Sequence, residues 1–572
     1  MKKTCKRLGA VLLAAFMLLS TMVCASAADD GTTLEGATTG KTITLTVNNV
    51  SDGDQVSAYR LVSYKADANG YDFNEGFEAY VNANKTNQGL TAEKYLASLD
   101  SAGVNSLLEG YATACQKKDD KTYELPEATD SVDAVSDKAS LTLQPGYYLL
   151  LTKTTSTNER IYTPIAAFVK VDGTDLVVYA GSSSNALTAG NDGAYTVAAK
   201  SADGPTIDKQ TNATQGDGEA SWKSTASAGV GELVRFYVKV NIPAYTNVKA
   251  LNLTVNDTLS NLEYKKDSVK VYDAEPVLNH EGGTTTVTGT VIDGAIKSQT
   301  IDNYNSATGK QTLKFDLDYE KIMGSQDART QAKSVYVYYE AIVQKEAVKE
   351  GNHIGENIAT LTYSNAATPD STHTTDKSET DVYNYYLRIT KIKGETTESL
   401  KGAKFALYLA KDSNTKMRFV KETNTDGSVY YRPAVDGDSQ DSIITDIEAD
   451  FQIRGLDANT YYLEETETPS GYYKPAGRFE IHLISKMENG KHTGKLDATN
   501  SSMKALETAD ANLLLSPNVD SNLAYEYSAG VKNSSTPNLP TTGGAGTMLL
   551  SIGGVVLMAA GAYLIFFRKK EN

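Results

Sequence analysis

The sequence contains little cysteine, tryptophan or histidine, and it has no excess of positive charge. Of its three cysteines, Cys5 and Cys24 lie in or beside an N-terminal apolar run, so only Cys115 remains elsewhere and no internal disulfide is expected. The five histidines are scattered, and H-E-x-x-H, G-x-S-x-G and phosphate-loop motifs are absent. A formal net charge of -16 argues against nucleic acid as a partner, because phosphate binding needs a basic surface. We therefore expect no cofactor, no metal site and no enzyme.

Both ends of the chain carry apolar runs. Near the N-terminus, basic residues precede the run Leu8–Leu19, and Ala25–Ala27 offers a small-residue cleavage site, so we expect a signal peptide over residues 1–27. Near the C-terminus, residues 545–567 carry no charge and are followed by the basic cluster Arg568–Lys570. This pattern predicts a transmembrane helix with a cytoplasmic tail, which leaves the preceding chain outside the cell.

The central part of the chain has a β-rich pattern. Tyrosine (35 residues) far outnumbers tryptophan (1), and short alternating runs rich in Thr, Val and Tyr are separated by turn residues. One region, around Glu93 to Gln116, has a helical pattern. The fold class is therefore predicted to be all-β, with immunoglobulin-like β-sandwiches in series. A Gly/Pro turn region and a polar strandless stretch suggest these boundaries: an N-terminal domain at 29–200, a middle domain at 204–381, a third domain at 382–535 and a tail at 539–572.

A polar pentapeptide, LPTTG, lies directly before the C-terminal apolar run. It consists of Leu539, Pro540, Thr541, Thr542 and Gly543, and Pro540 favours an extended backbone. Together with the span and the basic tail, it resembles the cell-wall sorting signal of Gram-positive surface proteins. The resemblance implies that a sortase thiol attacks the carbonyl of Thr542 and releases Gly543 with the span, so that the protein becomes anchored to the cell wall.

The third domain contains LRITKIKGETTESLKGAKFALY and YYLEETETPSGY, which resemble the B-type repeat of collagen adhesins (Cna-type domains). The resemblance implies a spontaneous isopeptide bond between Lys391 and Asn533, assisted by a buried Glu465. A lysine amine attacks only when it is neutral, and burial lowers its pKa while raising that of a nearby carboxyl group. A protonated carboxyl group can then polarise the asparagine amide and pass a proton to the departing ammonia.

Other lysines lie close to Lys391 in the sequence. Lys393 and Lys401 are alternatives, because a strand lysine usually points into solvent. Strand alternation favours Lys391, since it shares one face with the apolar Leu387 and Ile389. Lys393 has the same parity but lies at the turn.

The middle domain resembles an A-type relative from the same group of proteins, on the segments PTIDK, LNLTVNDTLSNLEY and GENIATLTYSN. The resemblance implies an isopeptide bond between Lys209 and Asn365, with Asp257 as the buried acid. Glu340, in VYYEAIV, is a rival for the role of the acid. In the N-terminal domain GYYLLLTK resembles the corresponding family strand, but no glutamate follows it, so the sequence offers no basis for a bond there.

The junction AYTVAAKSADGPTIDK resembles a degenerate pilin motif. Tyr195 and Val197 fit the motif, whereas Ala199 stands where proline is common. The resemblance implies that Lys200 is the nucleophile that receives Thr542 of the next subunit. A solvated linker lysine is the alternative, because both kinds of lysine are exposed.

These features together predict a structural protein, the shaft subunit of a sortase-assembled pilus. The expected partners are a pilin-type sortase, a housekeeping sortase, identical subunits, minor pilins and peptidoglycan. The alternative is a monomeric wall-anchored adhesin that binds a host or matrix ligand. The role of Lys200 separates the two, because an adhesin has no use for an acceptor lysine.

Overall fold

The fold was obtained as a computed structural model, which describes residues 40–535 apart from short gaps. The gaps are 65–70, 116–122, 156–158, 173–174, 182–184, 214–220, 245–250, 282–283, 325–330, 352, 365–371, 395, 397, 439–443 and 446–448. The predicted signal peptide, the residues Leu539 to Gly543 and the apolar run 545–567 lie outside the described residues. Within the described part of the chain, no helix is long and apolar enough to cross a bilayer.

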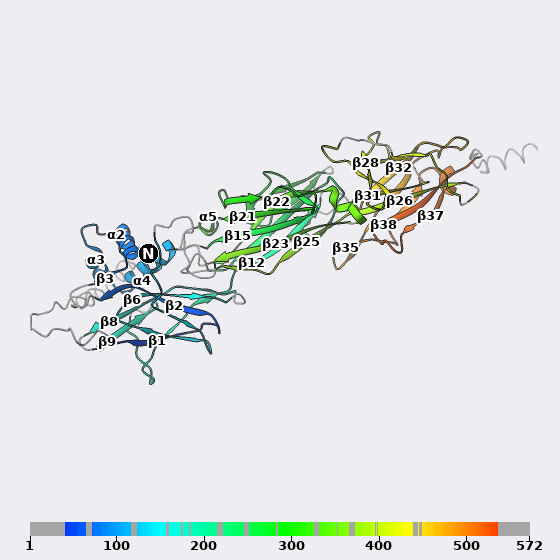
Figure 1. The fold of residues 1–572 in the computed structure, drawn as a ribbon. Coiled ribbons are helices and arrows are strands. Elements are labelled where there is room, and N and C mark those ends of the chain that lie inside the picture. Colours follow the sequence, from blue (N-terminus) through cyan, green and yellow to red (C-terminus); the bar gives the residue numbers. More distant parts are fainter. Residues whose placement is uncertain are drawn as a thin grey trace, which may run out of the picture.

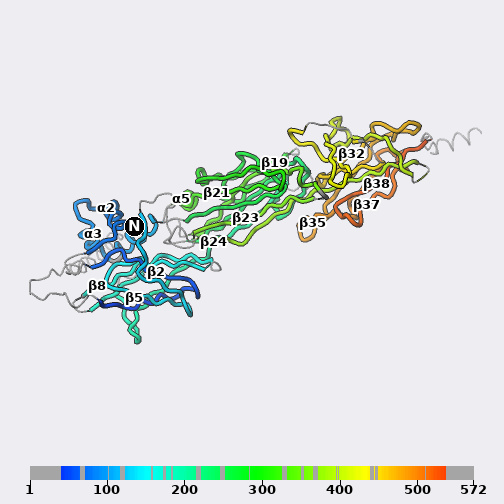
Figure 2. The backbone as a smooth tube through the Cα atoms, in the orientation of Figure 1, coloured from blue at the N-terminus to red at the C-terminus, as the bar shows by residue number. Residues whose placement is uncertain are grey.

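Three β-rich domains follow one another along the chain, and Figure 1 shows them in a row with the first and third at opposite ends. The tube in Figure 2 follows the same order, from blue through green to orange. Strands dominate every domain, so the all-β prediction is confirmed. The first domain here means β1 to β11, the second β12 to β25 and the third β26 to β38. The predicted boundary at residue 200 lies just before β11, and the one at 381 lies within β25.

The first domain packs two sheets together and adds helices to the outer face of the larger one. The strand β6 is buried along almost its whole length, because helices cover one face of its sheet and the second sheet covers the other. The larger sheet has the order β3 (Tyr71–Phe73), β2 (Gln55–Tyr64), β6 (Gly146–Lys153), β8 (Ile165–Asp172), β9 (Asp175–Ala180), with β4 (Asp130–Asp133) on β2. The smaller has the order β10 (Tyr195–Ala198), β1 (Ile43–Asn48), β5 (Lys138–Leu143), and β7 (Ile161–Tyr162) pairs with β11 (Ser201–Ala202).

The helices of the first domain are α2 (Glu75–Asn84), α3 (Ala92–Ser98) and α4 (Ser101–Cys115). Two begin at capping side chains, since Asn74 accepts a hydrogen bond from the backbone N–H of Phe77 and Thr91 from that of Lys94. The predicted helical region corresponds to α3 and α4, and α2 extends it upstream. Cys115 ends α4 in a buried position, where burial raises the pKa of its thiol to about 12.

The second domain is a sandwich of two sheets around a large apolar core. Alternate residues of β15 and β23 are buried, as expected for strands with one face on the core. One sheet has the order β12 (Thr206–Ala213), β14 (Leu233–Ile242), β22 (Lys333–Val343), β16 (Leu262–Tyr264), with β17 (Lys270–Tyr272) on β22. The other has the order β13 (Thr225–Ser227), β25 (Ser378–Tyr383), β23 (Ile354–Ser364), β15 (Leu253–Ser260), β21 (Lys310–Leu317), β20 (Ile296–Ile301), with β24 (Thr372–Thr374) on β23. The remaining elements are the hairpin β18 (Val277–Glu281) and β19 (Thr284–Thr288), α5 (Tyr319–Met323) and the 3-10 helix η3 (Lys345–Gly351).

The third domain is a second sandwich, in which the first and last strands are parallel neighbours. One sheet has the order β28 (Phe419–Thr423), β29 (Val429–Pro433), β31 (Asp450–Leu456), β26 (Tyr385–Lys393), β38 (Glu526–Asn533), β37 (Leu514–Val519). The other has the order β30 (Ile444–Thr445), β27 (Lys404–Tyr408), β32 (Thr460–Glu467), β33 (Phe479–His482), β36 (Ser502–Ala505). The hairpin β34 (Ser485–Glu488) and β35 (Lys491–Leu496) and the 3-10 helix η4 (Thr508–Leu513) complete it.

The second and third domains are joined by a close contact. The backbone of Val230 donates a hydrogen bond to the carbonyl of Gly455 over 2.9 Å, and the hydroxyl of Ser227 donates to the buried carboxylate of Asp457. Gly455 has a φ of +82°, and a Cβ there would lie 2.6 Å from a methyl group of Val230. Only glycine therefore allows the two backbones to approach this closely.

A histidine lies within the same interface. The ring of His353 stacks on that of Tyr525 with centroids 4.0 Å apart, and burial lowers the pKa of His353 below 6.5. The imidazole of His353 therefore binds a proton more tightly in the unfolded chain than in the folded chain. The stability contributed by neutral His353 is present above pH 6.5 and is lost as the pH falls toward the lowered folded-state pKa.

We expect the melting temperature of the protein to fall by a few degrees more between pH 7.5 and 5 than that of the His353→Phe variant, which keeps an aromatic ring without the titrating group. Calorimetry of both proteins across this pH range measures the difference. Parallel pH curves for the two proteins would contradict the assignment to His353.

Candidate functional site

A buried polar cluster lies between the two sheets of the second domain. Lys209 on β12 and Tyr339 on β22 reach it from one sheet, and Asp257 on β15 and Asn357 on β23 reach it from the other. All four side chains are at most 2% exposed. Asp257 and Asn357 belong to the alternating buried sets of β15 and β23, and Lys209 and Tyr339 face them from the other sheet.

The distances within this cluster are short. The amine nitrogen Nζ of Lys209 lies 2.5 Å from Oδ2 of Asp257 and 2.7 Å from the hydroxyl oxygen of Tyr339. The same hydroxyl accepts a hydrogen bond from Nδ2 of Asn357 over 2.7 Å. The amine is also 5.5 Å from the ring centre of Phe236. Burial lowers the pKa of Lys209 below its usual range, although the carboxylate of Asp257 acts in the opposite direction.

The predicted partner of Lys209, Asn365, lies outside the described residues. The preceding residue, Ser364, pairs with Asn252, which directly precedes β15 and lies five residues before Asp257. At about 3.4 Å per residue, five residues correspond to about 17 Å along the strand. Asn357, by contrast, lies diagonally across from Asp257, because Asp257 pairs with Ala359.

The rival acid, Glu340, points away from this cluster. Its carboxylate lies 2.7 Å from the amine of Lys265, and its neighbour Tyr339 points to the core instead. Consecutive strand residues face opposite sides of a sheet, so only one of these two side chains can reach Lys209. The carboxylate next to Lys209 is therefore that of Asp257, not that of Glu340.

The third domain contains a second buried cluster, in which Lys391 on β26, Glu465 on β32 and Asn533 on β38 are fully buried. The amine of Lys391 lies 3.0 Å from Oε2 of Glu465 and donates to the carbonyl of Val531 over 3.2 Å. Lys391 is opposite Val531 in the parallel register of β26 and β38, so Asn533 follows two residues later on the same face. The structure therefore brings together all three residues predicted for this domain.

The alternative lysines of this domain lie elsewhere. The side chain of Lys393 is 38% exposed and pairs with Glu398 over 2.6 Å, and Lys401 is exposed. Neither is in the buried set that contains Lys391. The alternation of Leu387, Ile389 and Lys391 toward the core is as predicted.

Both clusters contain polar atoms that lack a hydrogen bond. Among the described residues, no partner is found for Oδ1 of Asp257 and Asn357, or for Oε1 of Glu465 and Oδ1 of Asn533. Buried oxygens without donors are costly. A proton transferred from the lysine ammonium to the neighbouring carboxylate would give a neutral amine and a carboxylic acid, which could then donate to the free amide oxygen. That is the arrangement needed for an amine to attack an amide.

The sequence alone did not identify two residues of the second-domain cluster, Asn357 and Tyr339. Asn357 and Asn365 have the same parity along GENIATLTYSN, so alternation could not choose between them. Tyr339 is one of several tyrosines in SVYVYYEAIV, and its parity with Val335 and Val337 was the available signal for a core position.

The first domain shows no comparable cluster among its described residues. Its buried polar residues include no lysine and no glutamate; they are Asp54, Ser57, Asn105, Thr152 and Thr154. The sequence likewise offered no basis for an internal bond in this domain.

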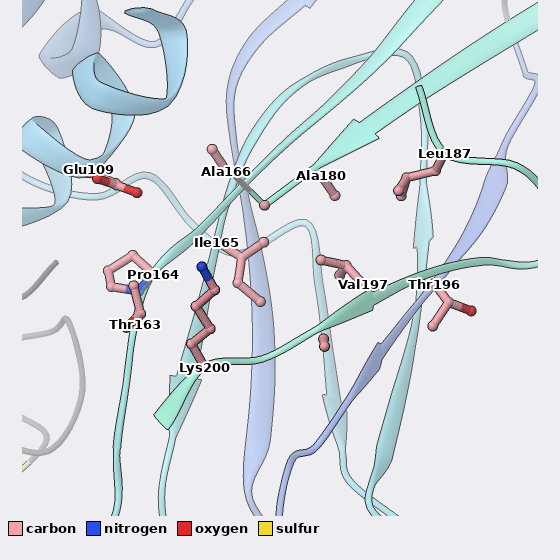
Figure 3. Close-up of a pocket in the computed structure, with 12 residues that line it drawn as sticks. Glu109, Thr163, Pro164, Ile165, Ala166, Ala180, Leu187, Thr196, Val197 and Lys200 are labelled. Atoms are coloured by element: carbon pink, nitrogen blue, oxygen red, sulfur yellow. The ribbon is translucent and has the colours of Figure 1, made fainter. Parts of the chain in front are cut away.

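The predicted acceptor, Lys200, is exposed in the segment between β10 and β11. Its backbone is held in place, since its carbonyl accepts a hydrogen bond from the N–H of Thr163 over 2.9 Å. The side chain of Lys200 lines a pocket of about 260 Å³, which Figure 3 shows. Glu109 of α4 lines the same pocket. Apolar side chains supply most of the remaining lining, among them Pro164, Ile165 and Val197.

Two family models match the chain. The model of the SpaA prealbumin-like fold domain matches residues 386–501, and that of the LPXTG cell wall anchor motif matches residues 531–572. No match to a curated protein was found.

Several solved pilin structures show some likeness to the chain. The T6 backbone pilin of Streptococcus pyogenes is 17% identical, with 87% of this chain and 99% of that chain covered and a TM-score of 0.44. The major pilin SpaD of Corynebacterium diphtheriae is 14% identical, with 87% and 98% covered and a TM-score of 0.40. RrgB from Streptococcus pneumoniae is 12% identical, with 78% and 93% covered and a TM-score of 0.40.

The two family matches cover distinct parts of the chain. The first contains Lys391 and Glu465, and the second contains Asn533 and the LPTTG sequence. The chain therefore carries a SpaA-type prealbumin-like domain and an LPXTG anchor, and it is a surface protein attached to the Gram-positive cell wall.

Proposed function

We propose that this protein is the shaft subunit of a covalent pilus. A pilin-type sortase would cleave after Thr542 and join its carbonyl to the amine of Lys200 in the next subunit. A housekeeping sortase would attach the last subunit to peptidoglycan, and minor pilins would join the same polymer. The chain would act as the sortase substrate, not as an enzyme on other molecules.

The observation that carries this proposal is that Lys200 and the end of the described chain lie in different domains. Lys200 lies in the first domain, whereas the described chain ends in the third domain, at the opposite end of the row in Figure 1. A bond between Lys200 of one subunit and the C-terminal segment of another would join the subunits head to tail, so that each added subunit lengthens the polymer. The result is a linear fibre, which a monomeric adhesin would not require.

The chain between the third domain and Thr542 is short. Thr542 is nine residues beyond Asn533, and a fully extended chain covers at most about 3.6 Å per residue, or about 32 Å in all. The end of one third domain must therefore lie close to the first domain of the next subunit. The apolar lining beside Lys200 suits the side chains of Leu539 and Pro540, which precede the reacting carbonyl.

Internal isopeptide bonds would strengthen each subunit of such a fibre. In the third domain, the amine of Lys391 would attack the side-chain amide of Asn533 with Glu465 as the acid, and ammonia would leave. This bond would tie β26 to β38, the first and last strands of the domain. Because forced unfolding depends on the unfolding rate, a covalent tie between these strands directs the load away from the hydrogen-bonded sheet.

In the second domain we propose a bond from Lys209 to Asn357, in place of the bond to Asn365. Support comes from the hydroxyl of Tyr339, which contacts both nitrogens, and from the position of Asn357 beside Asp257. This bond would join β12 of one sheet to β23 of the other. It would therefore cross-link the two layers of the sandwich.

Intact-mass spectrometry of the extracellular region, residues 28–535, tests the internal bonds. We expect the protein to be lighter than its sequence by two ammonia molecules. The Asn357→Ala variant should be lighter than its own sequence by only one, and it should lose about 2–5 kcal/mol of stability, as when a native cross-link is removed from a small domain.

The matched control is Asn365→Ala, which should keep both bonds. Loss of a bond in this variant, with retention in Asn357→Ala, would restore Asn365 as the partner of Lys209. An unmodified mass for the original sequence would contradict both internal bonds.

Wall extracts of cells that produce the protein test the polymer. Lys200→Ala should remove the ladder of high-mass species on denaturing gels, because the acceptor amine is gone. Lys138→Ala changes another exposed lysine of the same domain and should leave the ladder intact. A ladder that persists in Lys200→Ala would contradict Lys200 as the acceptor, and a single wall-linked species in the original protein would favour the adhesin.

A further inference from the structure

The hydroxyl of Tyr339 makes three hydrogen bonds in the second-domain cluster. It accepts one from Nζ of Lys209 over 2.7 Å and one from Nδ2 of Asn357 over 2.7 Å, and it donates to Oδ2 of Asp257 over 2.6 Å. In a Lys209 to Asn357 bond, the first of these nitrogens enters and the second leaves. One oxygen atom therefore touches both nitrogens between which a proton must move.

The surroundings of Tyr339 keep its hydroxyl neutral and in place. Burial raises the pKa of Tyr339 well above its ordinary value, and the nearby carboxylate of Asp257 acts in the same direction. The ring stacks on Phe236 at a centroid distance of 5.6 Å and packs near Phe315 at 6.0 Å. Because the ring is confined, the hydroxyl can change its hydrogen-bond partner by rotation about the C–O bond alone.

We propose that Tyr339 is a catalytic residue of isopeptide formation in the second domain, where it relays a proton from the entering nitrogen to the leaving nitrogen. This inference rests on the proposed bond between Lys209 and Asn357. It adds a proton relay by Tyr339 to the roles of the lysine and the acid.

In the proposed reaction one C–N bond forms and another breaks. The ammonium of Lys209 first transfers a proton to Asp257 along their 2.5 Å contact, which leaves a neutral amine and a carboxylic acid. Oδ2 then no longer needs the hydrogen of Tyr339. As Nζ bonds to Cγ of Asn357, it loses one proton to the tyrosine oxygen, and the tyrosine gives its own proton to Nδ2. The bond from Cγ to Nδ2 breaks, ammonia leaves, and Tyr339 is unchanged.

The third-domain cluster is built differently. There Nδ2 of Asn533 donates to the backbone carbonyl of Tyr473 over 2.8 Å, and the amine of Lys391 contacts Glu465 and the carbonyl of Val531. A carbonyl oxygen can accept hydrogen bonds but has no proton to give. The two domains of one chain thus provide a test reaction and an internal control.

The experiment follows both bonds over time in residues 28–535, made by cell-free synthesis and sampled by mass spectrometry of the two cross-linked peptides. We expect Tyr339→Phe to slow formation of the second-domain bond by about 100-fold, the scale of one general acid–base contribution, and to leave the third-domain rate unchanged. The slowing of the second-domain reaction in heavy water should also be smaller in Tyr339→Phe than in the original protein, which a merely structural role would not produce.

Two further variants separate chemistry from folding. Phe236→Leu alters the aromatic surroundings of Lys209 without touching the hydroxyl, so it should slow the reaction much less. In the Asn357→Ala background, which cannot form the bond, adding Tyr339→Phe should leave the melting temperature within a few degrees.

A second-domain rate in Tyr339→Phe equal to that of the original protein would overturn the relay while leaving the proposed bond intact. Equal slowing of both bonds would assign the effect to misfolding and also overturn the relay. So would a fall of more than a few degrees in the melting temperature of Asn357→Ala on adding Tyr339→Phe. If the original protein forms no second-domain bond at all, the proposed bond fails, and the relay fails with it.

Discussion

The burial of a lysine amine beside a carboxylate is the constraint on which the second and third domains depend. Removing two charges from water costs several kcal/mol per ion, and their attraction returns that cost only when the geometry is good. The residues of both pairs are at most 2% exposed. The amine nitrogen lies 2.5 Å from the carboxylate oxygen in the pair of Lys209 and Asp257, and 3.0 Å from it in the pair of Lys391 and Glu465. The strand registers of both sandwiches must hold these pairs in contact. A slip of one residue would turn each side chain to the opposite face.

The two domains satisfy this constraint in different geometries. In the third domain, Lys391 and Asn533 lie on neighbouring parallel strands of one sheet, with Glu465 reaching over from the other sheet. In the second domain, Lys209 and Asn357 lie on opposite sheets, with Asp257 beside the asparagine and Tyr339 beside the lysine. A bond in the first geometry resists the separation of two strands, whereas a bond in the second resists the separation of two layers.

The first domain differs from the other two in the placement of its lysines. Its described residues hold no buried lysine, and its exposed Lys200 lines a pocket at the segment that leads into the second domain. An amine that reacts within the domain must be buried with its target. An amine that reacts with another subunit must be reachable by the sortase and by an incoming peptide. In the proposed function the same residue type would serve two reactions, and exposure to solvent would separate them.

Much of this organisation was readable from the residues. Strand alternation was enough to place Lys391 on the core face with Leu387 and Ile389, and the Lys, Glu and Asn of the third domain come together as predicted. The apolar run with its basic tail and the LPTTG sequence were sufficient to predict the wall anchor. These features depend on neighbours along the chain, where periodicity and local chemistry carry the information.

The second-domain cluster could not be read in the same way. Asn357 and Asn365 share a parity, so the choice between them depends on the register of β23 against β15. These two strands lie about 100 residues apart in the sequence. The contact between Tyr339 and Lys209 likewise requires β12 and β22 to lie on either side of β14. Local sequence shows which face a side chain occupies, because the strand period is two. Which residue it meets on that face is set by long-range strand pairing, and no local pattern encodes that pairing.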